Sequence, residues 1–286
     1  MTDCIIIGGG PAGLSAAINL RQRGRSCLVL TGGPGALQKA ALVDNCAGLP
    51  GLSGPQLLET LTAHARAKGA QLRTARVSNI LPFGDRFMVN ADGEILECRA
   101  VVLACGAARS AEIAGEEAFL GRGVSYCATC DGMLYRQRRC VVWGLSDTAP
   151  QEAAYLTGIG VEVTYVAARR PETLPESISF VAGALKEIDG GDTVRQALLS
   201  DGQALPCDGV FILRTAIAPA RLLEGLALQD GCVAVDRRMA TNFPGVFAAG
   251  DCTGAPLQVS KALGEGQIAG LAAAEYCAAA EQQAKR

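Results

Sequence analysis

The feature that most constrains this sequence is a glycine pattern, Gly8-x-Gly10-x-x-Gly13, which directly follows the apolar run 3–7. The apolar run predicts a buried strand, and the residues after the glycines predict a helix. In such a strand–turn–helix, the first glycine permits the tight turn and the second lets the backbone approach a pyrophosphate. The third lets helix and strand pack closely. Free N–H groups at the helix N-terminus favour an anion, so the pattern predicts dinucleotide binding.

A helix over 14–23 and a strand over 26–30 complete a βαβ unit, and a second copy of this pattern occurs later in the chain. The strand 140–143 reaches Gly144, 136 residues after Gly8, and is followed by a second predicted helix and strand. Repetition at this spacing indicates two related folds in tandem. We therefore expect an α/β chain with two Rossmann-like, three-layer ββα nucleotide-binding domains.

A third segment, 245–251, reads as a strand that ends in Gly250-Asp251 and precedes a Gly/Ala-rich helix over about 260–280. A carboxylate at a strand end can accept hydrogen bonds from ribityl or ribose hydroxyls. Together with the first glycine pattern, Gly250-Asp251 predicts the far half of an FAD site. The intervening stretch 76–104 predicts several strands, with a hairpin turn at Asp92-Gly93.

The fourth motif is Cys127-Ala-Thr-Cys130-Asp131. Two thiols at this spacing can form a reversible disulfide, and the setting can lower the pKa of one thiol. Asp131 adds a carboxyl group that can carry a proton. The alternatives are half of a zinc site or two structural thiols. Zinc requires a second pair of ligands, whereas the sequence has no other CxxC and its only histidine is His64.

Composition narrows the class of protein further. The 286 residues are 49% hydrophobic and 19% charged, which is ample for a packed core. A net charge of -2 gives no reason to expect nucleic acid or an anionic membrane as a partner. We identify no membrane span, no signal peptide and no metal site, and expect a cytoplasmic protein. Most of the ten remaining cysteines lie in apolar runs and are expected to be small buried hydrophobic residues.

These motifs resemble the low-molecular-weight thioredoxin reductases over nearly the whole chain. The matching stretches are Ile7-Gly8-Gly9-Gly10-Pro11-Ala12-Gly13, then 121–132 around the CxxC, and 244–251. The resemblance implies an FAD domain split into 1–112 and 239–286, an inserted NADPH-type domain at 113–238, and a homodimer.

The resemblance also implies roles for individual residues. Cys130 would face the flavin, Cys127 would attack the partner protein, and Asp131 would be the acid/base residue. Asn45 matches a flavin-contacting asparagine of the family. The expected FAD-binding residues are Gly8, Gly10, Pro11, Ala12, Gly13, Thr31, Asn45, Ala104, Gly106, Gly250, Asp251, Gln258 and Val259.

The sequence departs from the family pattern where NADPH would bind. The second turn reads Gly144-Leu145-Ser146, so a side chain stands where bare backbone should approach a pyrophosphate. The arginine cluster that would grip a 2′-phosphate is thinned to Arg169-Arg170, with Thr173 at a later position. The stretch 211–214 also lacks the usual Ile-Gly-x-x-Pro type run. Elsewhere, Thr31 stands at the strand end after the first glycine pattern, where a ribose-binding acid is common, and Gln258-Val259 replaces an Arg-Gln pair on the flavin side.

These departures resemble the ferredoxin-linked, pyridine-nucleotide-independent branch of the family. We therefore expect an FAD-dependent disulfide oxidoreductase that reduces thioredoxin, or a similar protein, through Cys127 and Cys130, with ferredoxin as donor. Two other enzymes remain open: an NADPH-dependent thioredoxin reductase, in which Arg169 and Arg170 still bind phosphate, and an oxygen-dependent dithiol oxidase. A flavin-binding redox sensor or scaffold is the non-enzymatic alternative.

Overall fold

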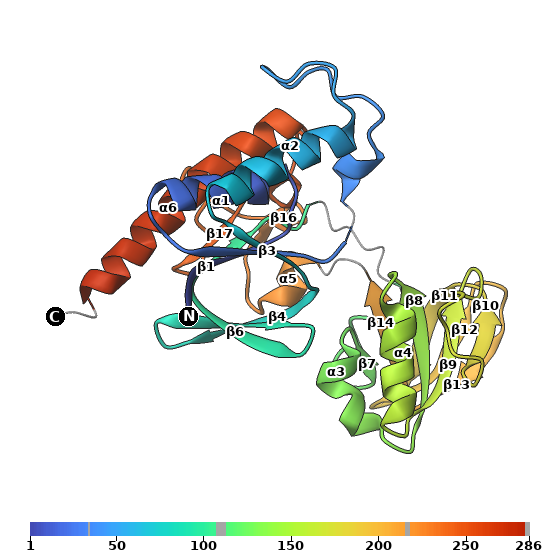
Figure 1. Ribbon diagram of the computed structural model, residues 1–286. Helices are drawn as coiled ribbons and strands as arrows, with labels where there is room; N and C mark the ends of the chain where they lie inside the picture. The colour runs from blue at the N-terminus through green and yellow to red at the C-terminus, as the bar shows by residue number, and fades with distance from the viewer. Residues whose placement is uncertain (34, 107–112, 215–217, 284–286) are drawn as a thin grey trace. The chain divides into compact units, whose positions relative to one another are not determined.

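The computed structural model describes residues 1–286 except 34, 107–112, 215–217 and 284–286 (Figure 1). The chain forms two compact units. One comprises Met1–Arg109 with Ala216–Arg286, and the other comprises Ser110–Thr215. Within the described residues, none of the helices combines the length and the apolar character needed to cross a membrane.

The first unit is built on a seven-stranded sheet among the described residues. Its strands β3, β2, β1, β6 and β17 are parallel, whereas β4 and β5 form an antiparallel meander with β6. The predicted hairpin at Asp92-Gly93 is confirmed between β5 and β6. The strands are β1 Thr2–Ile7, β2 Cys27–Thr31, β3 Gln71–Thr74, β4 Val77–Phe83, β5 Arg86–Ala91, β6 Glu94–Leu103 and β17 Val246–Ala248.

Helix α1 (Pro11–Gln22) packs along helix α6 (Val259–Gln283) with very little space between the two backbones. A Cβ on Gly266 would lie 2.1 Å from the Ala12 carbonyl oxygen, and one on Gly270 would lie 2.5 Å from that of Ala16. This close approach explains the Gly/Ala-rich sequence of α6. The other helices of this unit are α2 Gly54–Ala67 and α5 Pro219–Leu222, with 3₁₀ turns η1 Ala36–Lys39 and η3 Asp251–Thr253.

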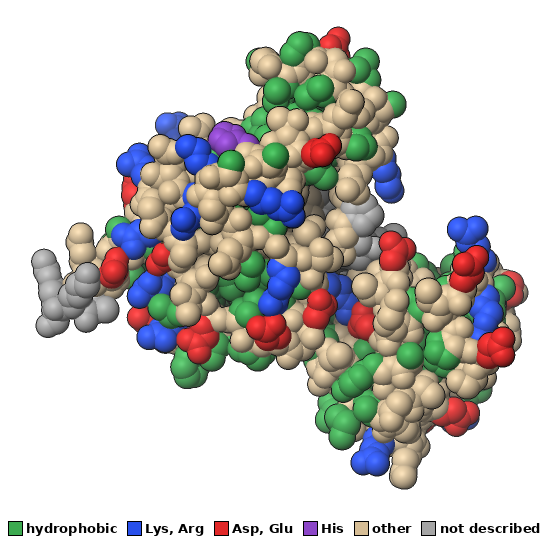
Figure 2. Space-filling view, viewed as in Figure 1, with side chains coloured by type: hydrophobic (Ala, Val, Ile, Leu, Met, Phe, Trp, Pro, Cys, Tyr) green, Lys and Arg blue, Asp and Glu red, His purple; other side chains and the backbone are tan. Residues whose placement is uncertain are grey.

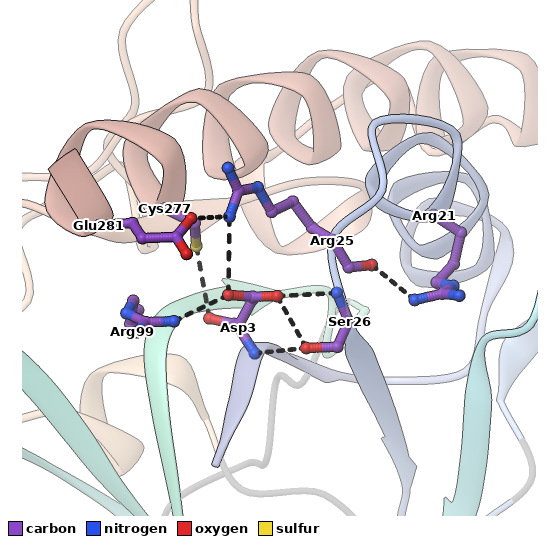
Figure 3. Close-up of polar contacts among 7 residues, drawn as sticks. All are labelled: Asp3, Arg21, Arg25, Ser26, Arg99, Cys277 and Glu281. Carbon is purple, nitrogen blue, oxygen red and sulfur yellow. Dashed lines mark hydrogen bonds and ion pairs between the residues drawn. The ribbon is translucent and has the colours of Figure 1, made fainter.

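A polar cluster joins the starts of β1 and β2 to the end of α6 (Figure 3). Asp3 accepts hydrogen bonds from the backbone and side chain of Ser26 and from Arg99, each within 2.9 Å. Arg25 bridges Asp3 and Glu281, and lies 2.8 Å from the latter. Burial works against the charge of Asp3, but these bonds and cations hold its pKa below the ordinary value. The cluster fastens the last helix to the first strand.

The second unit has the expected three layers. Its parallel sheet has the order β10-β9-β8-β14-β7. Along β8, Cys140 and Val142 pack in the core on the α4 side, and Val141 and Trp143 pack toward a three-stranded antiparallel sheet. The elements are β7 Val124–Ser125, α3 Ala128–Asp131, η2 Gly132–Tyr135, β8 Arg139–Leu145, α4 Ala149–Gly158, β9 Glu162–Ala167, β10 Ser179–Ala182, β11 Leu185–Gly190, β12 Val194–Leu199, β13 Ala204–Pro206 and β14 Gly209–Arg214.

The boundary between the units differs from the expectation at one end. The stretch 218–238, expected in the inserted domain, groups with the first unit. There α5 packs against β4, and the hairpin of β15 (Leu228–Gln229) and β16 (Cys232–Val233) packs against η3. The buried Leu222 and Leu223 explain this placement, because an apolar segment joins the core it can reach. The expected boundary at 112 lies outside the described residues.

The α/β class with Rossmann-like units is confirmed. Figure 2 shows acidic and basic side chains interspersed on the face in view.

Candidate functional sites

The glycine-rich turn of the first unit has the geometry that its sequence predicts. Gly8 has a φ of +117°, and a Cβ there would lie 2.1 Å from the Ala104 carbonyl oxygen. A Cβ on Gly13 would lie 1.9 Å from the Gly8 carbonyl oxygen. These two glycines are therefore required by the fold itself. A Cβ on Gly10 would meet no atom within 4 Å, so backbone at this position borders open space.

The N-terminus of α1 has the features of an anion site. Gly10 is the N-cap residue and offers no side-chain cap, Pro11 lies in the first turn, and that turn contains no acidic residue. The partial positive charge of a 12-residue helix is therefore not neutralised from within the helix. Open space at Gly10 and this positive end together fit a pyrophosphate group.

The Gly250-Asp251 motif lies against the same helix end, although it is far away in the sequence. Gly250 has a φ of +86°, and a Cβ there would lie 2.8 Å from the Cβ of Ala12. Burial raises the pKa of Asp251, as does the nearby Glu265, whereas Lys261 opposes this shift. The structure thus brings the first and third motifs together.

Two residues that the sequence reasoning missed hold the Gly250 turn. The ammonium group of Lys261 donates to the carbonyl oxygens of Gly250 and Gly254 at 2.8 and 2.7 Å. Glu265 accepts from the Gly250 N–H at 2.9 Å and forms an ion pair with Lys261 at 3.1 Å. Their i,i+4 spacing immediately after the Gly-Asp motif was the available signal.

The remaining expected cofactor residues lie around this turn or beside one another. The Thr31 Cβ would be 3.1 Å from a Cβ on Gly9, so Thr31 borders the glycine-rich turn. Gly106 has a φ of +72° and would present a Cβ to open space. Asn45 donates to the Gln258 side chain at 2.7 Å, although 213 residues separate the two. Val259, partly buried, begins α6.

In the second unit, Cys127 and Cys130 form a disulfide with a Cα–Cα distance of 5.3 Å. Cys127 caps the short helix α3, and its sulfur accepts a hydrogen bond from the Cys130 N–H at 3.2 Å. A donor in this position favours a thiolate at Cys127 once the disulfide opens. Cys127 is buried and Cys130 is exposed. The expected redox pair is thus present as a disulfide in this structure.

Asp131 follows directly and lies in the same helical turn. Its carboxylate accepts a hydrogen bond of 2.6 Å from the hydroxyl of Ser125, a buried residue at the end of β7. Sequence reasoning did not identify Ser125. Its position two residues before the CxxC is the only signal that pointed to it.

A buried ion pair was also missed. Glu116 is fully buried, and both of its carboxylate oxygens accept hydrogen bonds from Arg214 at the end of β14, one of them at 2.8 Å. Tyr126, next to Cys127, donates its hydroxyl to Glu116 at 2.9 Å. The Arg214 guanidinium lies 5.7 Å from the ring centre of Trp143 on β8 and 6.0 Å from that of Tyr126. This cluster occupies the ends of the two strands where the sheet order reverses.

The second glycine turn differs from the first in its backbone. Strand β1 ends at Ile7, before its glycines, but β8 continues through Gly144 to Leu145, which is paired with Arg214. Gly144 does not have the positive φ of Gly8. A Cβ on Gly144 would lie 1.8 Å from the Tyr165 hydroxyl oxygen, so this glycine makes room for a side chain of the protein. The tight turn of a dinucleotide site is absent at this position.

The N-terminus of helix α4 and the side chain of Arg170 already have partners within this unit. The first turn of α4 carries Glu152, an acidic residue that already complements the positive end of the helix. Arg170 donates to the backbone carbonyl oxygens of Pro175 and Ile178 and lies over the ring of Phe180. Arg169 is exposed.

The ten other cysteines are not paired in disulfides. Eight are buried, as expected, and Cys105 and Cys232 are partly exposed. Burial raises the pKa of Cys27 to about 11 and that of Cys98 to about 12, so these thiols stay protonated. Among the described residues, no group of His, Cys, Asp or Glu side chains could hold a metal ion. His64, the only histidine of the sequence, is exposed.

Comparison with known proteins gives consistent matches. A sequence model of the pyridine nucleotide-disulphide oxidoreductase family matches residues 2–266. A thioredoxin reductase of Listeria innocua is 34% identical over 297 residues, which cover 96% of this chain and 93% of the relative. A ferredoxin-flavin thioredoxin reductase of Clostridium acetobutylicum has a TM-score of 0.89 and 38% identity, with coverage of 96% and 97%. A thioredoxin reductase of Gloeobacter violaceus has a TM-score of 0.82 and 34% identity, with coverage of 98% and 95%.

Proposed function

We propose that ferredoxin, not NADPH, is the electron donor of this chain. The chain belongs to the pyridine nucleotide-disulphide oxidoreductase family and is a thioredoxin reductase-like flavin disulfide oxidoreductase. The substrate is the disulfide of thioredoxin or a similar protein. The observation that carries this proposal is the second glycine turn, where β8 continues straight through Gly144. The likeness to the Clostridium acetobutylicum ferredoxin-flavin thioredoxin reductase supports it.

Three features of the second unit disfavour a pyridine nucleotide, each for a different physical reason. The extended backbone at Gly144 leaves no tight turn for a pyrophosphate. Glu152 in the first turn of α4 would repel the phosphates. The guanidinium of Arg214, paired with Glu116, lies over Trp143 at the ends of β14 and β8, and nucleotides bind beyond such strand ends in open α/β sheets.

FAD is the cofactor of this family, and the first unit fits it. Gly8, Gly10 and Gly13 with the α1 N-terminus would hold its pyrophosphate, and Asp251 would accept hydrogen bonds from its hydroxyl groups. Asn45, Gln258 and Val259 would border the flavin. When bound, FAD collects electrons from the donor and supplies them in pairs for disulfide reduction.

The chain's own residues carry the exchange with the protein substrate. Cys130 is exposed, so its sulfur is accessible for reduction. The Cys127 sulfur accepts the Cys130 N–H and attacks the partner disulfide as a thiolate. Cys130 then displaces the partner from the mixed disulfide, and Asp131 holds the proton exchanged with the sulfurs. Next to the CxxC, Met133 and Leu134 are 58% and 73% exposed, an apolar surface suited to a protein partner.

The donor proposal predicts that NADPH does not bind. Titration of the holoprotein with NADPH should give no saturable change in heat or in the fluorescence of Trp143, the chain's only tryptophan. The Ser146→Gly variant should behave in the same way, because Glu152, Arg214 and the extended turn remain. Saturable NADPH binding by the unaltered protein would contradict the proposal. Binding by Ser146→Gly alone would show that the Ser146 side chain by itself prevents NADPH binding.

The FAD assignment predicts that Gly10→Ala loses the cofactor without unfolding. The added methyl group meets no protein atom but stands in the space assigned to the pyrophosphate. We expect the FAD dissociation constant to rise by at least roughly 10-fold, about 1.4 kcal/mol, with an unchanged circular dichroism spectrum. Gly158→Ala in the second unit also adds a methyl group that meets no atom and should retain FAD. Equal FAD retention in both variants would disprove the placement.

A further inference from the structure

Ser125 contacts both the redox cysteine and the acidic residue that follows the pair. It is 2% exposed, so water does not satisfy its hydroxyl. The Ser125 hydroxyl oxygen accepts the backbone N–H of Cys127 at 3.1 Å, and the hydroxyl O–H donates to an Asp131 carboxylate oxygen at 2.6 Å. The Cys127 carbonyl oxygen lies 3.3 Å from the same hydroxyl and also accepts the Asp131 N–H at 3.3 Å.

A serine hydroxyl has one proton and therefore donates to one acceptor at a time. With Asp131 ionised, the charge-assisted bond to its carboxylate is the stronger choice. When Asp131 carries a proton, its own O–H can donate to Ser125, and the Ser125 proton can turn toward the Cys127 carbonyl. Both protonation states of Asp131 then keep a hydrogen bond without any movement of heavy atoms.

We propose that Ser125 is a positioning residue for disulfide reduction, which holds Asp131 beside the redox cysteines in both of its protonation states. This rests on the proposed acid/base role of Asp131. Opening the S–S bond takes up two electrons, which the flavin of the proposed function would supply, and leaves negative charge on two sulfurs. One proton passes from Asp131 to one sulfur, and the resulting carboxylate takes the Ser125 hydrogen bond. The other sulfur stays a thiolate.

Among the described residues, the Tyr135 phenol on η2 is a titratable group that interacts with Asp131. Burial, and then the charges of Cys140 and Asp131, raise the pKa of Tyr135, so this phenol stays protonated at neutral pH. Helix α4 meets α3 around Gly132 with Tyr155, Leu156 and Ile159, whose contact atoms are apolar.

The test compares the pH profiles of single-turnover thioredoxin reduction in four variants. Asp131→Asn first identifies the limb of the profile that depends on Asp131. In Ser125→Ala we expect the rate to fall by about 10-fold to 100-fold, the loss of one charge-assisted hydrogen bond. The Asp131 limb should also weaken, because Asp131 is no longer held in place by the Ser125 hydroxyl. Ser125→Thr keeps a hydroxyl and should restore the limb.

Ser200→Ala is the matched control. It removes a serine hydroxyl that donates to the Ala184 carbonyl at 3.2 Å in the same unit, and it should keep the wild-type profile. If Asp131→Asn leaves the profile unchanged, the acid/base assignment and the role of Ser125 both fall. If Asp131→Asn removes a limb that Ser125→Ala leaves in place, only the role of Ser125 falls. A lowered melting temperature in Ser125→Ala with that limb unchanged would show a merely structural serine.

Discussion

The Cys130→Ser variant should retain FAD but lose thioredoxin reduction by more than roughly 10³-fold, the scale of losing an enzyme's nucleophile or its immediate partner. Cys127 then remains as a thiolate stabilised by the backbone N–H of residue 130. It should form a persistent mixed disulfide with thioredoxin, because no second thiol resolves it. A single-cysteine thioredoxin activated as its thionitrobenzoate disulfide traps this species for gel analysis under non-reducing conditions.

Cys127→Ser is the matched control for this trapping. It has the same loss of the disulfide but removes the sulfur that accepts the N–H of residue 130. We expect far slower trapping and equally low turnover. Faster trapping by Cys127→Ser than by Cys130→Ser would reverse the assigned roles, and rapid trapping by the double variant would place the reactive thiol elsewhere.

The largest effect on stability is expected from Glu116→Gln. The substitution keeps the shape of the side chain but removes the negative charge that is paired with the Arg214 guanidinium. The Arg214 side chain is only 11% exposed. Breaking a buried ion pair by removing one partner costs about 3–5 kcal/mol. Urea unfolding followed by Trp143 fluorescence measures the loss directly, because Trp143 lies against Arg214 in this cluster.

Glu275→Gln provides the control, because its ion pair with Arg238 has both side chains more than 60% exposed. Its effect should stay within roughly 1 kcal/mol. A change of the same small size in Glu116→Gln would show that the buried pair does not stabilise the unit. Adding Arg214→Met to Glu116→Gln should recover part of the loss, since the uncompensated charge is then gone.

The difference in the free energy of unfolding between wild type and Glu116→Gln should depend on pH, because Glu116 has a shifted pKa. Burial opposes its charge, but the Arg214 and Ile113 hydrogen bonds outweigh burial and hold the pKa below the ordinary 4.5. A lowered folded-state pKa gives stability that is present above the unfolded value and lost as pH falls through the folded value. The gap between wild type and Glu116→Gln should therefore be full above pH 4.5 and narrow below it.

Motifs in which local backbone dictates the residue were predictable from sequence. Gly8 and Gly13 lie so close to backbone oxygens that no side chain fits. Only glycine is tolerated at such positions, so the glycine pattern in the sequence reveals them. The CxxC was equally clear, since two thiols three residues apart lie within disulfide reach in a single helical turn. The loss of the second nucleotide turn was visible at Ser146, although the strand that continues through Gly144 was not.

Contacts between distant parts of the chain were not predictable. Glu116 and Arg214 are 98 residues apart, and neither stands out locally, since charged residues are usually on the surface. Arg170 illustrates the opposite error. Its position predicted a phosphate ligand in the NADPH alternative, whereas its guanidinium bonds to carbonyl oxygens of the following loop. The stretch 218–238 was misplaced because apolar patterning does not specify which core a segment joins.

The most direct test of the account is anaerobic reduction of the holoprotein, followed by the visible absorbance of its flavin. Reduced ferredoxin, NADPH and NADH are added separately, and free thiols on thioredoxin are counted afterwards. The account predicts rapid bleaching and thioredoxin reduction with ferredoxin, and neither with NADPH nor with NADH. Bleaching by NADPH at a rate that supports turnover would contradict it and would make the second unit a working nucleotide domain despite Ser146, Glu152 and Arg214.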